Sequence, residues 1–339
     1  MPKPRLTYQA LTLEFHRPFR LSTGTSMTRT AFWIRLENDE GWGEGTIPPY
    51  YNIPDEEMIA LWEKKAQSNM PFPNSPAEIP TWIGEEGPAP AKCALDLALH
   101  DRIAKKRHIP LYKLLNLPKP KAFATAFTIS IDTPEEMARI ARESAQYPVI
   151  KLKLGTQDDV AHVAAVRGAR PDARIYVDAN AAWNPNEAIR HIKNLEPYNL
   201  ELIEQPTAVD DIEGMGYVQA HSKTPLVADE SVRSMADVEA LAKAGVEGIN
   251  LKLMKIGGLI PALEMLRRGR ELGLKIMLGC MSETALGVTA MANLTAYADW
   301  IDLDAPLLIK NNPFLGVKYD EEARLHLPKG AGIGVEQVG

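Results

Sequence analysis

Five charged residues recur at nearly constant spacing in the later part of the 339-residue chain. They are Lys153, Asp178, Glu204, Asp229 and Lys252, and successive members lie 25, 26, 25 and 23 residues apart. Each ends or follows a short apolar segment typical of a buried strand. A lone charge at a strand end is usually a solvated rim residue or a salt bridge. Five charged residues at nearly the same spacing instead predict a ring of functional side chains, because buried charges must pair with one another or with a ligand.

The three carboxylates of this set predict a metal site. Asp178, Glu204 and Asp229 would offer only oxygen atoms, which suits Mg²⁺, with Mn²⁺ as a possible substitute. Zinc would favour Cys or His ligands instead. Asn180 lies two residues after Asp178 and shares its face of the strand, so we expect it to support the ligands.

The two lysines predict proton transfer at a carbon atom. On a ring of eight strands, the second and sixth strands lie opposite each other, so Lys153 and Lys252 would face each other. One lysine would remove the proton α to a carboxylate and the other would return it to the opposite face, while the metal stabilises the enediolate. Lys151 shares a face with Lys153 and would add positive charge. We expect burial and this charge to lower the pKa of the catalytic lysines.

Two further carboxylates, Asp302 and Asp304, share one face of the last apolar segment. On the ring, that segment lies opposite the one that carries Glu204. We expect the two aspartates to hold a cationic group of the ligand. The alternative is that they cap the strand or pair with Lys310.

A repeat of strands and helices must position these residues. Helical stretches at residues 134–147, 184–195 and 234–245 alternate with apolar segments, which predicts parallel strands in a (β/α)8-type barrel with its site at the C-terminal ends of the strands. A doubly wound open sheet is the alternative, but no GxGxxG follows the first strand. The eight apolar segments are residues 122–130, 149–155, 174–180, 200–206, 226–231, 248–254, 275–280 and 300–305.

The composition excludes several classes of protein. Apolar residues make up 45% and charged residues 24% of the chain, which argues against disorder and coiled coil. A net charge of −6 without a basic tract argues against nucleic acid. No apolar run reaches the roughly 18 residues of a membrane span, and no signal peptide is expected. Cys93 and Cys280 are expected to be free thiols in a reducing cytoplasm.

Six motifs in this order resemble the enolase superfamily, in its muconate-lactonising subgroup. They are KLK (151–153), VDAN (177–180), EQP (204–206), ADES (228–231), NLKLMKIGG (250–258) and CMSETALG (280–287). The resemblance implies a modified (β/α)7β barrel over residues 118–312 and an α+β capping domain over residues 1–117, to which the tail 313–339 returns. It also implies the same metal ligands and the same two acid/base lysines as the spacing argument.

Within this subgroup, Asp302-Leu-Asp304 resembles the Asp-x-Asp with which dipeptide epimerases hold the α-ammonium of the N-terminal residue. We therefore expect an isomerase that inverts the α-carbon of the C-terminal residue of a dipeptide, and a homo-oligomer. N-acylamino-acid racemase, o-succinylbenzoate synthase and muconate-type cycloisomerase remain alternatives within the superfamily. A non-catalytic binding protein is a further alternative, against which the lysine pair argues.

The side-chain specificity of the substrate is expected to reside in two cap loops, near residues 18–30 and 46–57. Gly24 stands where epimerases acting on Ala-Glu carry an arginine, and Arg20 and Arg29 are out of register with it. We therefore expect dipeptides with a non-acidic C-terminal residue. Glu44 and the acidic run at 55–57 would favour a cationic one, unless they form a solvated helix start.

Five other residues are expected to contact the substrate. Tyr50 and Tyr51 would line an apolar pocket, or else pack within the cap. Thr128 would touch the substrate amide, or else cap its strand. Ser282 and Glu283 follow the seventh strand, where Glu283 would bond Lys252 or the substrate, or serve as a helix N-terminal charge.

Overall fold

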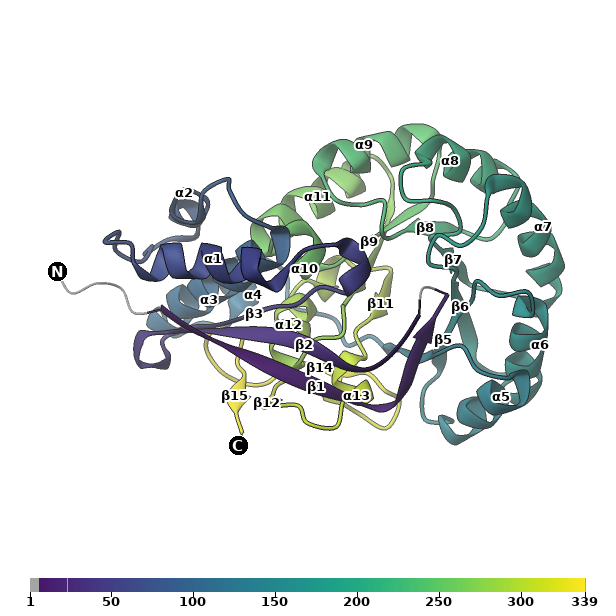
Figure 1. Ribbon diagram of the computed structural model, residues 1–339, viewed down its shortest axis with the longest axis horizontal. Coiled ribbons are helices and arrows are strands. Elements are labelled where there is room, and N and C mark those ends of the chain that lie inside the picture. The colour runs from purple at the N-terminus through teal and green to yellow at the C-terminus, as the bar shows by residue number, and fades with distance from the viewer. Residues whose placement is uncertain (1–5, 23, 339) are drawn as a thin grey trace.

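The computed structural model describes residues 6–22 and 24–338, with only the backbone of Asp39. The first five residues of the expected capping domain and Thr23 of the first cap loop lie outside the described residues. An N-terminal sheet with its helices lies beside a larger ring of strands and helices (Figure 1).

The ring is an eight-stranded parallel barrel in chain order. Leu303 donates its backbone N–H to Thr125 Oγ1 at 2.8 Å, which joins the last strand to the first. The expected TIM-type barrel is therefore confirmed over the open sheet. Its strands are β4 (Ala126–Ile129), β5 (Val149–Lys153), β6 (Arg174–Asp178), β7 (Leu202–Glu204), β8 (Leu226–Ala228), β9 (Gly248–Leu251), β10 (Lys275–Gly279) and β11 (Trp300–Asp302).

Helices connect these strands along the outside of the barrel (Figure 1). Asn184 and Ser234 begin two of them with capping boxes, which satisfy free backbone N–H groups. Seven connections between eight strands give the (β/α)7β order. The helices are α5 (Pro134–Glu143), α6 (Asp159–Ala169), α7 (Pro185–Leu195), α8 (Ile212–Ala220), α9 (Met235–Ala244), α10 (Leu253–Ile256), α11 (Leu259–Glu271), α12 (Ala285–Ala292) and, after β11, α13 (Ala305–Leu308). Short 3-10 turns lie at Glu196–Tyr198 and Thr295–Tyr297.

The N-terminal part packs an antiparallel sheet against the buried helix α3 (Ala89–Lys106). A Cβ atom on Gly43 would lie 1.9 Å from the carbonyl oxygen of Ala94, so the glycine of the third strand permits this close contact. The strands are β1 (Leu6–Leu21), β2 (Gly24–Leu36) and β3 (Trp42–Gly45), and the other helices are α1 (Asp55–Ala66), α2 (Ile79–Ile83) and α4 (Leu111–Leu114). Short 3-10 turns lie at Glu37–Asp39, Pro49–Tyr51 and Pro76–Glu78.

The β1–β2 hairpin reaches over the barrel (Figure 1). Lys310 donates its backbone N–H to the carbonyl of Glu14 at 2.8 Å, so β1 is joined to the segment after β11. Near the hairpin tip, a Cβ atom on Gly155 would lie 2.9 Å from the Cβ atom of Ser22. These contacts hold the hairpin over the ends of β5 and β11.

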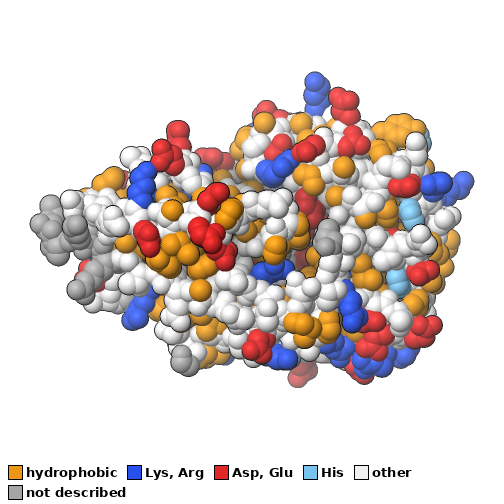
Figure 2. Space-filling view, in the orientation of Figure 1, with side chains coloured by type: hydrophobic (Ala, Val, Ile, Leu, Met, Phe, Trp, Pro, Cys, Tyr) orange, Lys and Arg blue, Asp and Glu red, His pale blue; other side chains and the backbone are white. Residues whose placement is uncertain are grey.

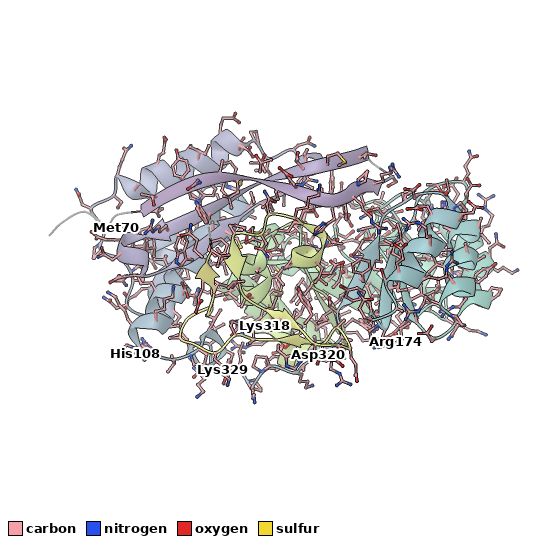
Figure 3. The ribbon with its side chains drawn as sticks, turned by 90° about the horizontal axis from the view of Figure 1, so that it is seen from below. Met70, His108, Arg174, Lys318, Asp320 and Lys329 are labelled. Atoms are coloured by element: carbon pink, nitrogen blue, oxygen red, sulfur yellow. The ribbon has the colours of Figure 1, made fainter. Side chains whose placement is uncertain are left out.

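The C-terminal tail contacts the N-terminal part as well as the barrel. The Phe314 ring packs edge-on against the Trp33 ring, and Ile333 donates its N–H to Asp101 of α3 at 2.7 Å. Figure 3 shows the tail near Lys318 and Asp320. Its strands are β12 (Phe314–Leu315), β13 (Lys318–Tyr319), β14 (Leu325–His326) and β15 (Glu336–Gln337). Among the described residues, no helix has the length and apolar character to cross a membrane.

Candidate active site

The structure places the five regularly spaced charges at one end of the barrel. Lys153, Asp178 and Glu204 are the last residues of β5, β6 and β7, and they are neighbours in strand register. Asp229 and Lys252 directly follow β8 and β9. This is the C-terminal end of the strands, where barrel enzymes carry their sites.

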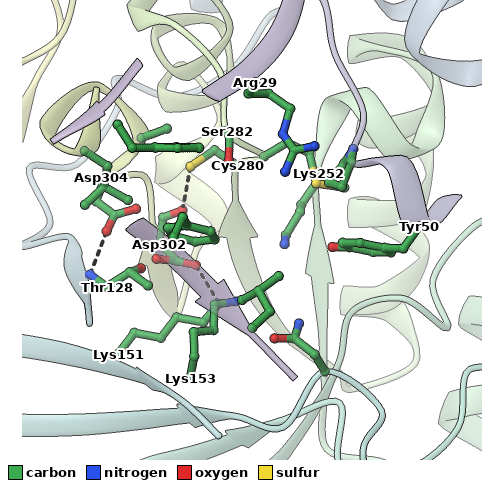
Figure 4. A pocket seen from close by; sticks show the side chains of 18 residues that line it. Arg29, Tyr50, Thr128, Lys151, Lys153, Lys252, Cys280, Ser282, Asp302 and Asp304 are labelled. Atoms are coloured by element: carbon green, nitrogen blue, oxygen red, sulfur yellow. Dashed lines mark hydrogen bonds and ion pairs between the residues drawn. The ribbon is translucent and has the colours of Figure 1, made fainter. Parts of the chain in front are cut away.

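A pocket opens at this end, lined on the cap side by the hairpin and the second cap loop (Figure 4). Acidic and basic side chains are visible in the hollow between the cap and the barrel in Figure 2. The cap contributes Phe15, Phe19, Leu21, Arg29, Pro48 and Tyr50. The barrel contributes Thr128, Lys151, Lys153, Asn180, Lys252, Cys280, Met281, Ser282, Asp302, Asp304, Ala305 and Leu308.

Lys151 is surrounded by carboxylates. Its Nζ atom lies 2.6 Å from Glu204 Oε2, 2.7 Å from Asp302 Oδ2 and 3.1 Å from Asp178 Oδ2. Burial opposes its charge, but the carboxylates outweigh burial and hold the pKa of Lys151 well above its ordinary value. Lys153 Nζ lies 2.6 Å from the same oxygen of Asp178. Lys151 therefore stays charged beside the pocket.

Asp229 pairs with two lysines. Its Oδ2 lies 2.8 Å from Lys252 Nζ, and its Oδ1 lies 2.6 Å from Lys255 Nζ. A lowered pKa was expected for the catalytic lysines. Burial does oppose the charge of Lys252, but Asp229, together with Glu204 and Tyr51, outweighs burial, so the pKa of Lys252 is instead raised well above its ordinary value.

The buried acidic groups at the barrel mouth outnumber the lysines among them. Six carboxyl groups face four lysines, so the carboxyl groups exceed the lysines by two. Burial, with Asp178 and Asp229 nearby, raises the pKa of Glu204 to about 8. The carboxylates are Asp178, Glu204, Asp229, Glu230, Asp302 and Asp304, and the lysines are Lys151, Lys153, Lys252 and Lys255.

This excess of carboxyl groups over lysines and the oxygen-only donors fit a divalent cation such as Mg²⁺. Within the described ranges, however, no three His, Cys, Asp or Glu side chains are gathered into a ready-made metal site. The reason is visible at Asp178 and Asp229, whose oxygens are turned onto lysine ammonium groups. The lysines occupy the positions next to the carboxylates that a cation would compete for.

Asp302, the last residue of β11, and Asp304, two residues further on, lie across the pocket from Lys252 (Figure 4). Thr128 donates its backbone N–H to Asp304 Oδ2 at 2.7 Å, and Cys280 Sγ donates to the carbonyl of Asp302 at 3.3 Å. Burial and Asp302 raise the pKa of Asp304 to about 7. No described ion pair joins either aspartate to Lys310.

The other predicted residues divide between the pocket and its surroundings. Ser282, Tyr50 and Asn180 line the pocket, and Asn180 donates to Glu230 Oε1 at 3.0 Å. Gly24, Tyr51 and Glu283 are not among its lining residues. The carboxylate of Glu283 accepts the backbone N–H of Met281 at 2.8 Å.

The acidic residues proposed for a cationic side chain have structural partners instead. Glu44 is fully buried and accepts hydrogen bonds from Thr284 and Gly287 at the start of α12. The acidic run at 55–57 is the first turn of α1, where it complements the helix dipole.

Two polar residues at the site were not predicted from the sequence, and a third, Arg29, was set aside there as out of register. Asn250 donates to Glu204 Oε1 at 2.9 Å, and it lies two residues before Lys252, so strand alternation would have found it. Lys255 reaches back to Asp229 from the short helix after β9, which alternation does not reveal. Arg29 lines the pocket although it is five residues beyond the expected arginine position.

Fold and site together define a barrel with a capping domain and an acidic, lysine-flanked centre at its mouth. A family model described as "Enolase C-terminal domain-like" matches residues 134–337. The chain belongs to this family.

The relatives of this chain are named for more specific activities than the family model is. The chain is 34% identical over 338 residues to an L-Ala-D/L-amino acid epimerase from Maribacter sp., covering 98% of each chain. It superposes on a dipeptide epimerase from Enterococcus faecalis, solved with Mg and L-Leu-L-Tyr, with a TM-score of 0.91, at 32% identity, covering 99% of this chain and 100% of the other. It also superposes on an N-succinyl Arg/Lys racemase from Bacillus cereus with a TM-score of 0.90, at 26% identity, covering 99% of this chain and 96% of the other.

Proposed function

We propose that the chain is a dipeptide epimerase that inverts the α-carbon of the C-terminal residue. One observation carries this proposal: Lys153 and Lys252 line a single pocket together with Asp302 and Asp304. The lysine-bearing strands β5 and β9 are four places apart in the ring of eight. The similarity to proteins named as epimerases supports the same reaction.

The chain's own residues would bind the substrate and transfer the α-proton. Asp302 and Asp304 bind the α-ammonium of the substrate, since charge-assisted pairs with carboxylates are strong. The α-carbon of the second residue then lies between Lys153 and Lys252. One lysine, in its neutral form, takes the α-proton, and the opposite lysine donates a proton to the other face. Lys151 holds a positive charge beside the reacting carboxylate.

Asp178, Glu204 and Asp229 would hold Mg²⁺, or Mn²⁺ in its place. When bound, the cation supplies positive charge next to the substrate carboxylate, which lowers the cost of removing the α-proton. Asp229 would then be shared between the cation and Lys252. Because Asp229 is the main group that raises the pKa of Lys252 against burial, that pKa would fall toward the range needed for base catalysis.

The expectation of a non-acidic C-terminal residue rested on Gly24. That glycine is not among the pocket-lining residues, and open space surrounds the position of its missing Cβ atom. Arg29 does line the pocket, so a cation is present after all. Gly24 therefore carries no argument for a non-acidic C-terminal residue.

Deuterium exchange tests the proposal directly. Free dipeptides, N-acetyl and N-succinyl amino acids are incubated with the Mg²⁺-loaded protein in D₂O, and mass spectrometry detects uptake at the α-carbon. We expect uptake in free dipeptides, with both epimers formed. Faster uptake in the N-acylated amino acids would favour the racemase alternative. Absence of uptake in every compound would contradict the epimerase.

A further inference from the structure

The third strand of the cap, β3, presents two chemically different faces. Its sequence is part of GWGEG at residues 41–45, in which every second residue is glycine. A Cβ atom on Gly45 would lie 2.7 Å from the carbonyl oxygen of Pro90, so this glycine, like Gly43, lets α3 pack close to the strand. Strand alternation turns Glu44 to the opposite face, toward the barrel. The strand therefore has α3 on one side and the start of α12 on the other.

Glu44 accepts three hydrogen bonds from the barrel, and it is 0% exposed. Thr284 donates its backbone N–H to Oε1 at 2.8 Å and its hydroxyl to Oε2 at 2.6 Å, and Gly287 donates its N–H to Oε2 at 3.0 Å. Burial raises the pKa of Glu44, and these three donors oppose the rise. Both oxygens therefore act as acceptors. A glutamine here would turn an N–H group toward backbone N–H donors that cannot accept a hydrogen bond.

The residues that Glu44 holds follow directly on a wall of the pocket. Met281 and Ser282 line the pocket, and Thr284 is two residues further along the chain. Figure 4 shows Ser282 beside Cys280 at this wall. The hydroxyl of Thr284 also accepts the N–H of Leu286 at 3.1 Å, so the same side chain caps α12. One carboxylate of the cap thus fixes both the end of the segment 281–284 and the start of the helix behind it.

Glu283 provides a second anchor within the same segment. Its Oε1 accepts the N–H of Met281 at 2.8 Å. A Cβ atom on Gly287 would lie 1.9 Å from Glu283 Oε2, so Gly287 leaves room for this carboxyl group while its N–H binds Glu44. Burial and the nearby Glu44 raise the pKa of Glu283 well above its ordinary value. The first anchor comes from the cap and the second from the segment itself.

We propose that Glu44 is a positioning residue for the active site: it holds the segment 281–284 so that Ser282 contacts the substrate, and the pocket is complete only while β3 is docked on α12. Glu44 is not among the described residues that line the pocket, so it acts through this segment and not on the substrate itself. The inference rests on the proposed function, because it assigns part of the substrate contact in that reaction to a residue of the cap.

A double-mutant cycle tests the proposal by α-deuterium uptake and calorimetric binding of one free dipeptide. The proteins are the Mg²⁺-loaded wild type, Glu44→Gln, Ser282→Ala and the double variant. We expect each single change to lower kcat/KM about tenfold or more, since a small misplacement of a substrate contact is costly. The double variant should be no worse than the weaker single variant, because both changes remove the same contact.

Two further variants separate positioning from general stability. Glu40→Gln is the matched control, because the Glu40 carboxylate pairs with Arg102 at 2.8 Å within the cap. It should keep the kcat/KM of the wild type even where its Tm falls. Thr284→Val removes the hydroxyl of the same contact from the barrel side. It should share the loss of Glu44→Gln and the lack of additivity with Ser282→Ala, and it decides the question if Glu44→Gln does not fold.

Each outcome distinguishes the role of Glu44 from the epimerase itself. With uptake present in the wild type, losses that multiply in the double variant, or a loss in Glu44→Gln that Ser282→Ala does not share, would overturn the positioning role alone. An unchanged kcat/KM in Glu44→Gln would do the same. Uptake in no protein would overturn the epimerase, and the cycle in binding affinity then decides on Glu44. Failure of the wild type to bind the dipeptide would overturn both.

Discussion

Lys151 Nζ on β5 lies 2.7 Å from Asp302 Oδ2 on β11, across the intervening strand β4. The same ammonium contacts Asp178 and Glu204, so it joins the acidic centre to the aspartate pair. The second oxygen of Asp302, Oδ1, is buried and has no hydrogen-bond partner in the described structure. Lys151 thus fixes one oxygen of Asp302 and leaves the other for a ligand.

This arrangement predicts how Asp302 acts on substrate choice. A free dipeptide should react about tenfold to a hundredfold faster in kcat/KM than its N-acetyl form, because acetylation removes one charge-assisted contact. Asp302→Asn should shrink that ratio toward one, since the neutral amide no longer attracts the ammonium. The exposed Asp210, paired with Arg233, offers the control Asp210→Asn, which should keep the ratio. An unchanged ratio in Asp302→Asn would remove this residue from the ammonium site.

If Lys153 and Lys252 act as two opposed bases, replacing either one should abolish epimerisation but leave α-proton exchange of one epimer. Lys153→Ala and Lys252→Ala should each abolish conversion of one epimer into the other. Each variant should still exchange the α-proton of one epimer in D₂O, because one face keeps its base. Lys243→Ala, on the exposed side of α9, is the control. Full epimerisation by either active-site variant would contradict the two-base mechanism.

The acidic centre predicts dependence on a divalent cation. EDTA should remove activity, and added Mg²⁺ or Mn²⁺ should restore it. Glu204→Gln should weaken Mg²⁺ binding, measured by calorimetry, because an amide is a poorer ligand for a hard cation. Glu196→Gln, exposed before the same strand, should bind Mg²⁺ like the wild type. Undiminished turnover in the EDTA-treated protein would contradict the proposal that a cation assists removal of the α-proton.

The repeat made the barrel and its charged ring predictable from sequence. Lys153, Asp178 and Glu204 interrupt apolar strands at a nearly constant spacing. In a barrel of repeated strand–helix units, residues spaced by one repeat lie at the same level along the barrel axis. The direction of the lysine pKa shift was not predictable in this way. It depends on which oxygen each ammonium contacts, and Lys252 contacts Asp229 at 2.8 Å.

The cap was less predictable for a physical reason. Its residues reach the pocket through the hairpin's path over the barrel, and this path depends on long-range contacts such as that of Glu14 with Lys310. Local matching predicted Gly24 beside the substrate, whereas the structure has Arg29, and not Gly24, lining the pocket. A register deduced from neighbours along the chain does not reveal which strand of a hairpin faces the pocket.

The raised carboxyl pKa values predict how stability changes with pH. Asp304 and Glu230 have pKa values of about 7 and Glu204 of about 8, whereas in the unfolded chain such groups titrate near about 4. Between these limits the folded state binds more protons than the unfolded state, so the free energy of unfolding falls as pH rises. Without a cation, we expect the Tm in EDTA to fall by several degrees from pH 5 to pH 8. Mg²⁺ should offset much of this fall because it binds the folded, ionised centre. Asp304→Asn should flatten the slope in EDTA, and a Tm that rises over this range would contradict the protonated carboxyl groups.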